Sequence, residues 1–408
     1  MKARRATLGC CAVVILAATL TGCAPTADTL GARTVRPDSI TAENDTTPRR
    51  IVPGLTASGT VESDRAPVAA DDVVVSLRFP DSERGRLSFV GATSAGTRWQ
   101  IDTNPSCVGS ALTRAGDEEL IVVLDSDARL DGGRVATRTV ATAFRTDTGK
   151  RVWGPVDVPG PIQGPGLIFS STPKAIVSAD PVSRVMLSAH DGSVVVDETA
   201  SDDVQIDYES NGVGIVRVAG ELRAMDSRTS RTLWDSDSLA RPDGTDSTWL
   251  ASVDATADTS RATVVVLRWD DPDGAQVVAA HNLRTGRVLG LLPGALEAHT
   301  VSSPSGSHIV VASTQTPGAT TLTAIGPIKG TLWTRSMTGT VTLESASDAT
   351  LYVRNDAHGV ALNLASGAER ARGDFAVPLA VLADGTAILP TGNQSRYLLA
   401  APTPKDGP

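Results

Sequence analysis

The sequence is poor in the residues from which metal and catalytic sites are most often built. Among 408 residues it has four cysteines, five histidines and 3% aromatic residues. The histidines are scattered without metal-ligand spacing. His190 and His281 fall in a recurring turn motif, which favours a structural role. We therefore expect no metal site and no catalytic histidine.

Basic charge and helical patterns are also scarce. The chain has 37 Lys and Arg against 46 Asp and Glu, a formal net charge of −9. Nucleic-acid binders depend on clustered cations, so we expect no nucleic-acid partner. No segment repeats apolar residues at helical spacing over about 12 positions. Instead, short β-branched runs such as Val73–Leu77, Leu120–Leu124 and Val264–Leu267 alternate with Gly, Pro, Asp, Asn and Ser, which predicts an all-β fold.

The N-terminus carries the clearest motif. An apolar stretch from Leu8 to Leu20 follows Lys2, Arg4 and Arg5 and ends in the tetrapeptide Leu20-Thr21-Gly22-Cys23. This pattern resembles the lipobox of bacterial lipoproteins, and the stretch is shorter than the ~20 residues of a spanning helix. The resemblance implies that residues 1–22 are a signal peptide and that Cys23 carries lipid at the extracytoplasmic face of the cell membrane. The alternative is an ordinary secretory signal.

Signal removal changes the charge and the cysteine chemistry. Cleavage after residue 22 takes three basic and no acidic residues, which leaves 34 Lys and Arg against 46 Asp and Glu. Cys10 and Cys11 leave with the signal and Cys23 carries lipid, so Cys107 is the remaining thiol. No intrachain disulfide is then available, and we expect Cys107 to be a buried small apolar residue.

Domain boundaries follow from a change in texture. Residues 23–70 are rich in Thr, Ser, Asp, Pro and Gly, which predicts a lipidated flexible tether, although Ile51–Val61 could supply one strand. Residues 71–402 are predicted to be the folded domain, and residues 403–408 a disordered tail.

A repeated unit organises this domain. An apolar strand enters a Gly-centred turn and leaves through a basic residue toward Trp or an aliphatic residue, most fully from Ala143 to Trp153. The repeat positions are Gly96, Trp99, Gly149, Trp153, Gly192, Trp234, Gly286, Gly330, Trp333 and Gly367, with Ser230 at the remaining turn. Gly suits the positive φ of a tight turn, and Trp offers a large flat area for packing between units. Unrelated β-sandwiches are the alternative.

The unit resembles the quinoprotein-like (PQQ-like) β-propeller repeat over about residues 73–401. The resemblance implies a propeller of four-stranded blades. Seven units end in the motif and an eighth unit without it follows, which favours eight blades over seven. The last unit, from Pro378 to Ala401, shows only three strands, so we expect its outer strand to come from upstream of Asp72. The unit around Gly286 is expected to use 249–256, 262–269, 275–283 and 287–292.

Enzymatic chemistry finds little support. Quinoprotein dehydrogenases clamp their quinone with an adjacent cysteine pair, and here the adjacent pair Cys10-Cys11 lies in the signal. We therefore expect no cofactor and no catalytic residue. The segment Asp125–Gly133 faintly resembles a calcium loop but lacks its closing Glu, so we expect a solvated hairpin turn and no metal. Trp249 and Trp269 lie outside the repeat phase, and we expect core packing over ligand stacking for both.

Two acidic loops give the interaction hypothesis. We expect them to project from one face of the disc as an interaction rim; their residues are Asp125, Asp127, Asp131, Asp270, Asp271 and Asp273. The favoured function is a monomeric, lipid-anchored interaction or scaffold module of the cell envelope with an unidentified envelope protein as its partner. A solute- or glycan-binding receptor is the alternative, and an enzyme is less favoured.

The lipid assignment predicts that Cys23→Ala yields a folded protein without lipid, because the anchor contributes no core contact. Membrane fractionation checks the anchor, and thermal unfolding of the soluble form checks the fold. A variant that still sediments with membranes would contradict the assignment.

Overall fold

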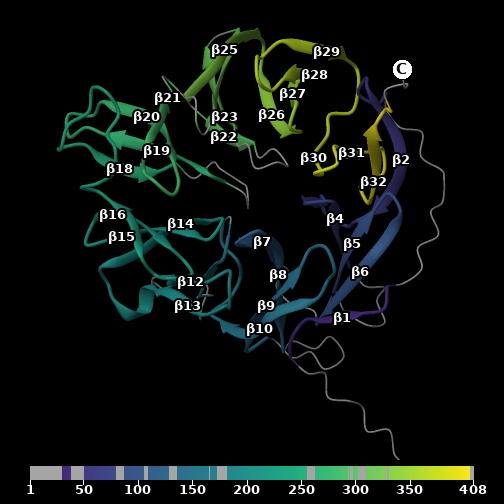
Figure 1. The fold of residues 1–408 in the computed structure, drawn as a ribbon, viewed down its shortest axis with the longest axis horizontal. Helices are drawn as coiled ribbons and strands as arrows, with labels where there is room; N and C mark the ends of the chain where they lie inside the picture. Colours follow the sequence, from purple (N-terminus) through teal and green to yellow (C-terminus); the bar gives the residue numbers. More distant parts are fainter. Residues whose placement is uncertain are drawn as a thin grey trace, which may run out of the picture.

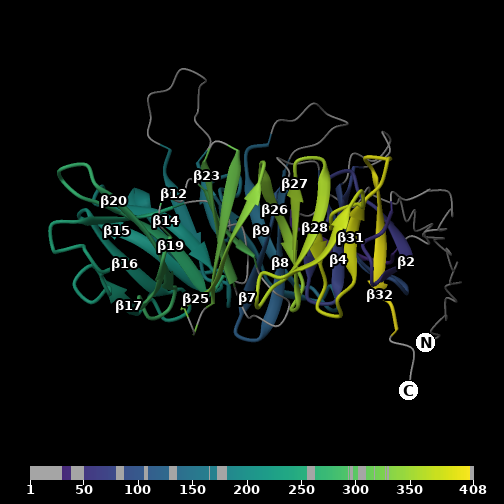
Figure 2. The same cartoon turned by 90° about the horizontal axis from the view of Figure 1, so that it is seen from above.

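The computed structural model describes residues 30–37, 50–79, 87–104, 109–127, 136–164, 166–171, 182–254, 262–292, 294, 297–301, 309–316, 318–326, 328 and 330–404. Strand pairing groups these residues into eight antiparallel sheets. The sheets stand in a ring about one axis, and the edge-on view shows a flattened disc (Figures 1 and 2). Contacts between β3 and β30 close the ring. The fold is therefore an all-β propeller.

Most sheets have four strands in chain order. The exceptions among the described residues are a three-stranded sheet, β11–β13, a five-stranded sheet in which β1 joins β3–β6, and the sheet of β2 and β30–β32, whose strands come from both ends of the chain. The first half of the chain contains β1 (Arg33–Val35), β2 (Leu55–Glu62), β3 (Val68–Ala70), β4 (Val73–Arg78), β5 (Leu87–Thr93), β6 (Gly96–Thr103), β7 (Ser110–Ala115), β8 (Glu118–Ser126), β9 (Thr139–Arg145), β10 (Arg151–Val158), β11 (Ile168–Ser170), β12 (Arg184–Leu187), β13 (Val194–Asp197), the 3-10 helix η1 (Glu198–Ala200), β14 (Val204–Ser210), β15 (Val213–Val218), β16 (Glu221–Asp226) and β17 (Thr232–Asp235).

The second half continues the same arrangement. Its strands are β18 (Leu250–Val253), β19 (Val264–Asp270), β20 (Gln276–Asn282), β21 (Val288–Leu291), β22 (Glu297–Val301), β23 (Ile309–Thr316), β24 (Ala319–Gly326), β25 (Gly330–Thr338), β26 (Val341–Ala346), β27 (Thr350–Asn355), β28 (His358–Asn363), β29 (Glu369–Gly373), β30 (Ala380–Val381), β31 (Ala387–Pro390) and β32 (Arg396–Pro402). The four strands expected around Gly286 match β18–β21 to within a few residues.

One sheet joins the two ends of the described chain. The strand order is β2-β32-β31-β30, and β2 pairs antiparallel with β32 from Leu55↔Pro402 to Glu62↔Arg396. The predicted closure by a strand from upstream of Asp72 is confirmed. Because the sheet needs both ends, the ring cannot close until the whole domain has been synthesised.

The predicted tether over residues 23–70 is wrong for its described part. β1, β2 and β3 all belong to sheets, so the propeller begins well before residue 71. Val52 and Val61 are 3% and 5% exposed because the last strands of the chain cover them. Apolar residues without local periodicity can still be buried when their partners lie far away in sequence.

Tryptophan–glycine junctions connect neighbouring sheets. Each indole packs on the turn of the next sheet, and its Nε1–H donates to the carbonyl three residues before the turn glycine. The donor–acceptor distances are 2.7 to 2.9 Å; the bonds are Trp99 to Thr146, Trp153 to Ala189, Trp234 to Leu283 and Trp333 to Leu364. The facing glycines are Gly149, Gly192, Gly286 and Gly367, with φ between +65° and +74°. The structural role predicted for these tryptophans is confirmed.

The remaining turns of the motif vary this junction. Ser230 has φ +55°, so a non-glycine residue holds the left-handed conformation there. At Gly330 an added Cβ would lie 2.6 Å from the carbonyl oxygen of Leu289, which stands where other sheets have Trp. At Gly96 an added Cβ would meet no atom within 4 Å. Glycine is favoured there by its backbone conformation, with φ of +120°, and not by a neighbouring side chain.

The junction predicts a large difference between two glycine substitutions of equal backbone strain. Gly149 and Gly116 have φ of +65° and +68°, but an added Cβ meets Trp99 Cβ at 2.6 Å at Gly149 and nothing within 4 Å at Gly116. Gly149→Ala should therefore cost about 1–3 kcal/mol more than Gly116→Ala in the free energy of unfolding. Denaturant unfolding of both variants measures this difference. Equal costs would mean that the indole contact contributes nothing.

Candidate functional site

The predicted acidic rim does not form one patch. The described parts of its two loops leave β8 and β19, the second strands of their sheets, on the same side of the ring. Two further sheets, β11–β13 and β14–β17, stand between them (Figure 1). Asp131 lies outside the described residues. The two loops must be considered separately.

Asp125 does not belong to an exposed rim. It is fully buried, and its carboxylate accepts hydrogen bonds from the backbone N–H groups of Gly31, Asn104 and Ser126 at 2.7 to 2.9 Å. Burial raises the pKa of Asp125, while these N–H donors act in the opposite direction. The sequence prediction was wrong here because β8 extends to Ser126. Asp125 therefore lies in the strand and not in the loop that follows, and its carboxylate joins separate chain segments.

Asp127 also serves the loop that carries it. Its two carboxylate oxygens accept bonds from the N–H and hydroxyl of Thr137 and from the N–H of Arg138. These bonds fasten the base of the β8–β9 connection. They agree with the expected hairpin turn, part of which lies outside the described residues.

A coherent acidic surface forms at the second loop. We call it the acidic rim: Asp243 and Asp246 before β18, and Asp270, Asp271 and Asp273 after β19. Segments 241–250 and 270–275 together contain these five aspartates and one cation, Arg241. Leu250 pairs with Asp270 in the β18–β19 register, which holds both segments together. Asp243 and Asp246 were not predicted from the sequence, because the β17–β18 connection carries no repeat motif.

Arg241 fastens this connection to the sheet beneath it. Its Nη1 donates to the carbonyl of Asp246 at 2.7 Å, and its guanidinium lies 5.4 Å from the centroid of the Trp269 ring. Arg241 is therefore engaged with the scaffold. Asp246 accepts bonds from Thr248 that lower the pKa of its carboxyl group, so it stays ionised.

The acidic rim also presents an apolar residue. Leu250 is 70% exposed at the start of β18. An exposed leucine beside several carboxylates offers a partner both apolar contact and negative charge. Such a surface suits binding, because it has fixed charge but no paired acid and base.

The groups most able to do chemistry are buried in the scaffold. Glu209 of β14 is fully buried and accepts bonds from the N–H of Leu167 at 2.6 Å and of Gly212 at 3.2 Å. Burial raises the pKa of Glu209 to about 7. An added Cβ on Gly166 would lie 2.0 Å from its Oε2. The segment around Gly166 therefore lies directly over the carboxylate.

His281 is likewise structural. Its Nε2 accepts from Trp269 Nε1–H at 3.3 Å, and its Nδ1 lies 3.1 Å from the carbonyl oxygen of Gly286. Burial lowers the pKa of His281 to about 4. Trp269 is 1% exposed, and Trp249 packs against the same core. Core packing, expected for both tryptophans, is confirmed, and the expected structural role of His281 agrees with these bonds.

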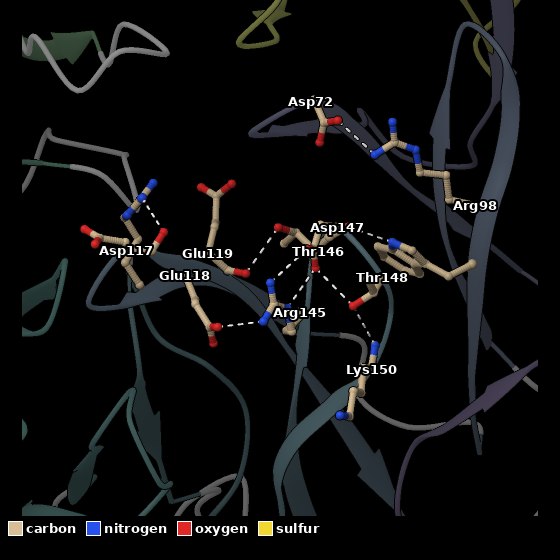
Figure 3. A network of polar contacts seen from close by, with 12 residues as sticks. Asp72, Arg98, Asp117, Glu118, Glu119, Arg145, Thr146, Asp147, Thr148 and Lys150 are labelled. Atoms are coloured by element: carbon tan, nitrogen blue, oxygen red, sulfur yellow. Dashed lines mark hydrogen bonds and ion pairs between the residues drawn. The ribbon is translucent and has the colours of Figure 1, made fainter.

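The side of the ring that carries the glycine turns has a mixed charge network (Figure 3). Arg145 forms ion pairs with Glu118 at 2.6 Å and with Asp147 at 2.9 Å. The hydrogen bond from Arg145 lowers the pKa of Asp147. Since opposite charges pair within this network, it presents less net charge to a partner than the acidic rim does.

The described residues contain neither a metal-binding cluster nor a membrane-spanning helix. Within the described residues, no group of three or more His, Cys, Asp or Glu side chains is placed to hold a metal ion. Over the same part of the chain, no helix has the length and apolarity to cross a membrane. Cys107, Gly132 and Gly133 lie outside the described residues.

Comparisons with known proteins give distant structural likenesses. No protein-family model matches the sequence, and neither does any curated protein. A propeller domain of Myceliophteria thermophila Cps50 (Swd1) is 9% identical, with 86% of this chain and 100% of that chain covered and a TM-score of 0.40. Kuenenia stuttgartiensis hydrazine synthase is 11% identical over 90% and 100% of the two chains, TM-score 0.36. A eukaryotic initiation factor is 10% identical over 81% and 91%, TM-score 0.37. These TM-scores are too low to carry functional information.

The two buried titratable groups predict opposing pH dependences. The folded-state pKa of Glu209 lies above its ordinary 4.5, so its contribution to the free energy of unfolding falls as pH rises from 4.5 to 7. The folded-state pKa of His281 lies below its ordinary 6.5, so its contribution is lost as pH falls from 6.5 to 4.

Glu209→Gln should therefore remove one of these two pH dependences and leave that of His281. Between pH 4.5 and pH 7, the free energy of unfolding of the variant minus that of the unsubstituted protein should increase by about 3 kcal/mol. Urea unfolding at a series of pH values measures the difference. A difference that is constant with pH would show that Glu209 keeps its ordinary pKa.

Proposed function

We propose that this protein is an extracytoplasmic, lipid-anchored interaction module that binds a basic segment of an envelope protein through the acidic rim. The observation that carries the proposal is the division of charged groups. Asp125, Glu209 and His281 are buried in hydrogen bonds that build the sheets, whereas the aspartates of the acidic rim are at least partly exposed on two segments that are joined where the exposed Leu250 pairs with Asp270. Fixed carboxylates on a rigid propeller steer and orient a cationic partner without a chemical step.

The anchor and the repeat family are parts of the same proposal. The Leu20–Cys23 motif supports lipidation of Cys23 and release of the domain outside the cytoplasm. The regular Trp–Gly junctions are compatible with a PQQ-like repeat. The proposal includes no quinone and no catalytic activity, because the adjacent cysteines Cys10-Cys11 precede the lipidated residue.

A matched charge reversal tests the rim. In the rim variant Asp243, Asp271 and Asp273 become Lys; in the control Asp117, Asp202 and Glu221, which are exposed on other sheets, become Lys. Both variants change the net charge equally. A lysine-rich peptide immobilised on a surface serves as the probe, and binding is measured between 50 and 300 mM salt.

The rim variant should lose about tenfold or more in affinity together with most of the salt dependence, since close charge pairs at interfaces contribute more than 1 kcal/mol each. The control should lose little. Equal losses in both variants would mean that net charge alone attracts the probe, and the rim assignment would fail. If the rim variant alone loses affinity, crosslinking in cells from position 250 would identify the natural partner.

A further inference from the structure

The segment that follows the lipidation motif is fixed on the outer edge of the ring. β1 pairs antiparallel with β6, from Arg33↔Asp102 to Val35↔Gln100, and so adds a fifth strand to that sheet. Ala32 is 4% exposed and belongs to the same apolar core as Ile101 and Phe144. The chain is therefore held by the fold as early as residue 32.

This segment also bridges to the neighbouring sheet. The N–H of Gly31 donates to Asp125 Oδ2 at 2.7 Å, and the hydroxyl of Thr34 donates to the carbonyl of Gly149 at 2.8 Å. A Cβ on Gly31, where φ is +131°, would lie 3.3 Å from Pro155. We call residues 31–35 the strap, because they fasten the chain across the β3–β6 and β7–β10 sheets.

The strap sets the length of chain between lipid and fold. Eight residues lead from Cys23 to Gly31, which span at most about 28 Å when extended. If the first fixed element were β2, 32 residues would lead from Cys23 to Leu55 and could span about 110 Å. The shorter leash restricts which part of the ring can reach the bilayer.

We propose that the outer edge formed by the strap and β10 lies against the headgroups of the membrane that holds the lipid on Cys23. The proposal rests on the lipid anchoring proposed above and adds the orientation of the propeller. The edge therefore has a defined occupant, an anionic phospholipid surface.

The side chains on this edge suit that occupant. Arg36, Lys150 and Arg151 are exposed on the strap end and at the start of β10, and Val152 is 39% exposed beside them. The nearby carboxylates of Asp147 and Asp157 are engaged by Arg145 and Arg138. A cationic edge on an acidic protein would turn toward anionic lipids while the rest of the surface is repelled.

The same orientation sends the acidic rim away from the bilayer. Figure 1 places β18–β20 across the ring from β1. An anionic membrane would repel the rim and, if that surface lay against the lipid, would also block it. When the strap edge lies against the membrane, the acidic rim faces away from it and is accessible to an envelope partner.

Energy transfer from two matched positions to the membrane tests the orientation. The full lipidated protein, with Cys107→Ser, carries a donor dye at Val152→Cys on β10 or at Leu291→Cys on β21; both are outer strands, and these residues are 39% and 38% exposed. The protein is bound to phosphatidylglycerol–phosphatidylethanolamine vesicles that contain an acceptor-labelled lipid. Transfer from position 152 should exceed transfer from position 291 at least twofold.

A leash variant serves as the control. Insertion of ten Gly and Ser residues between Ala27 and Asp28 leaves the strap intact but lengthens the leash, so the excess at position 152 should fall toward equality. Equal transfer from both positions without the insertion, or greater transfer from 291, would overturn the orientation. The charge part is tested by Arg36→Gln, Lys150→Gln and Arg151→Gln together, which should lower the excess on these vesicles but not on phosphatidylcholine.

Mass spectrometry separates the failures. Acyl mass on Cys23 together with equal transfer would overturn only the orientation. Absence of acyl mass, with protein that does not float with vesicles, would overturn the anchoring and this inference with it. Thermal unfolding of each labelled protein confirms that the substitutions leave the propeller folded.

Discussion

The packing of one indole on one left-handed glycine turn is the contact on which the ring depends. A four-stranded sheet cannot bury both of its faces alone, so each must pack against the next. The indole fills the space between two sheets, and its N–H satisfies a carbonyl of the turn it covers. A side chain on the turn glycine would occupy the same space as the ring, which explains why tryptophan and glycine recur together.

Not every junction uses this pair, and the exceptions have local reasons. Leu289 replaces tryptophan opposite Gly330, and there the glycine avoids a backbone oxygen instead of an indole. The sheet made of β2 and β30–β32 has no turn between its outer two strands, because these come from opposite ends of the chain. Its long register over β2 and β32 supplies the closure that a covalent turn supplies elsewhere.

The same rigidity separates scaffold from surface. Buried ionisable groups here act as fasteners: Asp125 gathers backbone N–H groups from the strap and the sheet, and Glu209 does the same for the segment near Leu167. By contrast, Asp246 and Asp270 of the acidic rim accept bonds from the nearby side chains of Thr248 and Gln276, and the aspartates of the rim are at least partly exposed. The shape of the acidic rim is therefore set by the strands beneath it.

Sequence alone determined what depends on local pattern. β-branched runs separated by turn residues gave the all-β class, and the phased Gly and Trp residues gave the repeat and most strand positions, because a turn requiring positive φ leaves a local trace. The strand expected from upstream of Asp72 followed from counting strands in the last unit.

Tertiary structure decided what depends on contacts between distant segments. The alternating carboxylates of Asp125 and Asp127 do not show that Asp125 is buried, because an exposed turn can carry the same pattern. The sequence predicts a tether where the strap lies, because a three-residue strand that joins a distant sheet has no periodicity of its own. The β18–β19 register holds together the two segments that carry the acidic rim. Neither segment by itself predicts this pairing, because it depends on residues of the other segment.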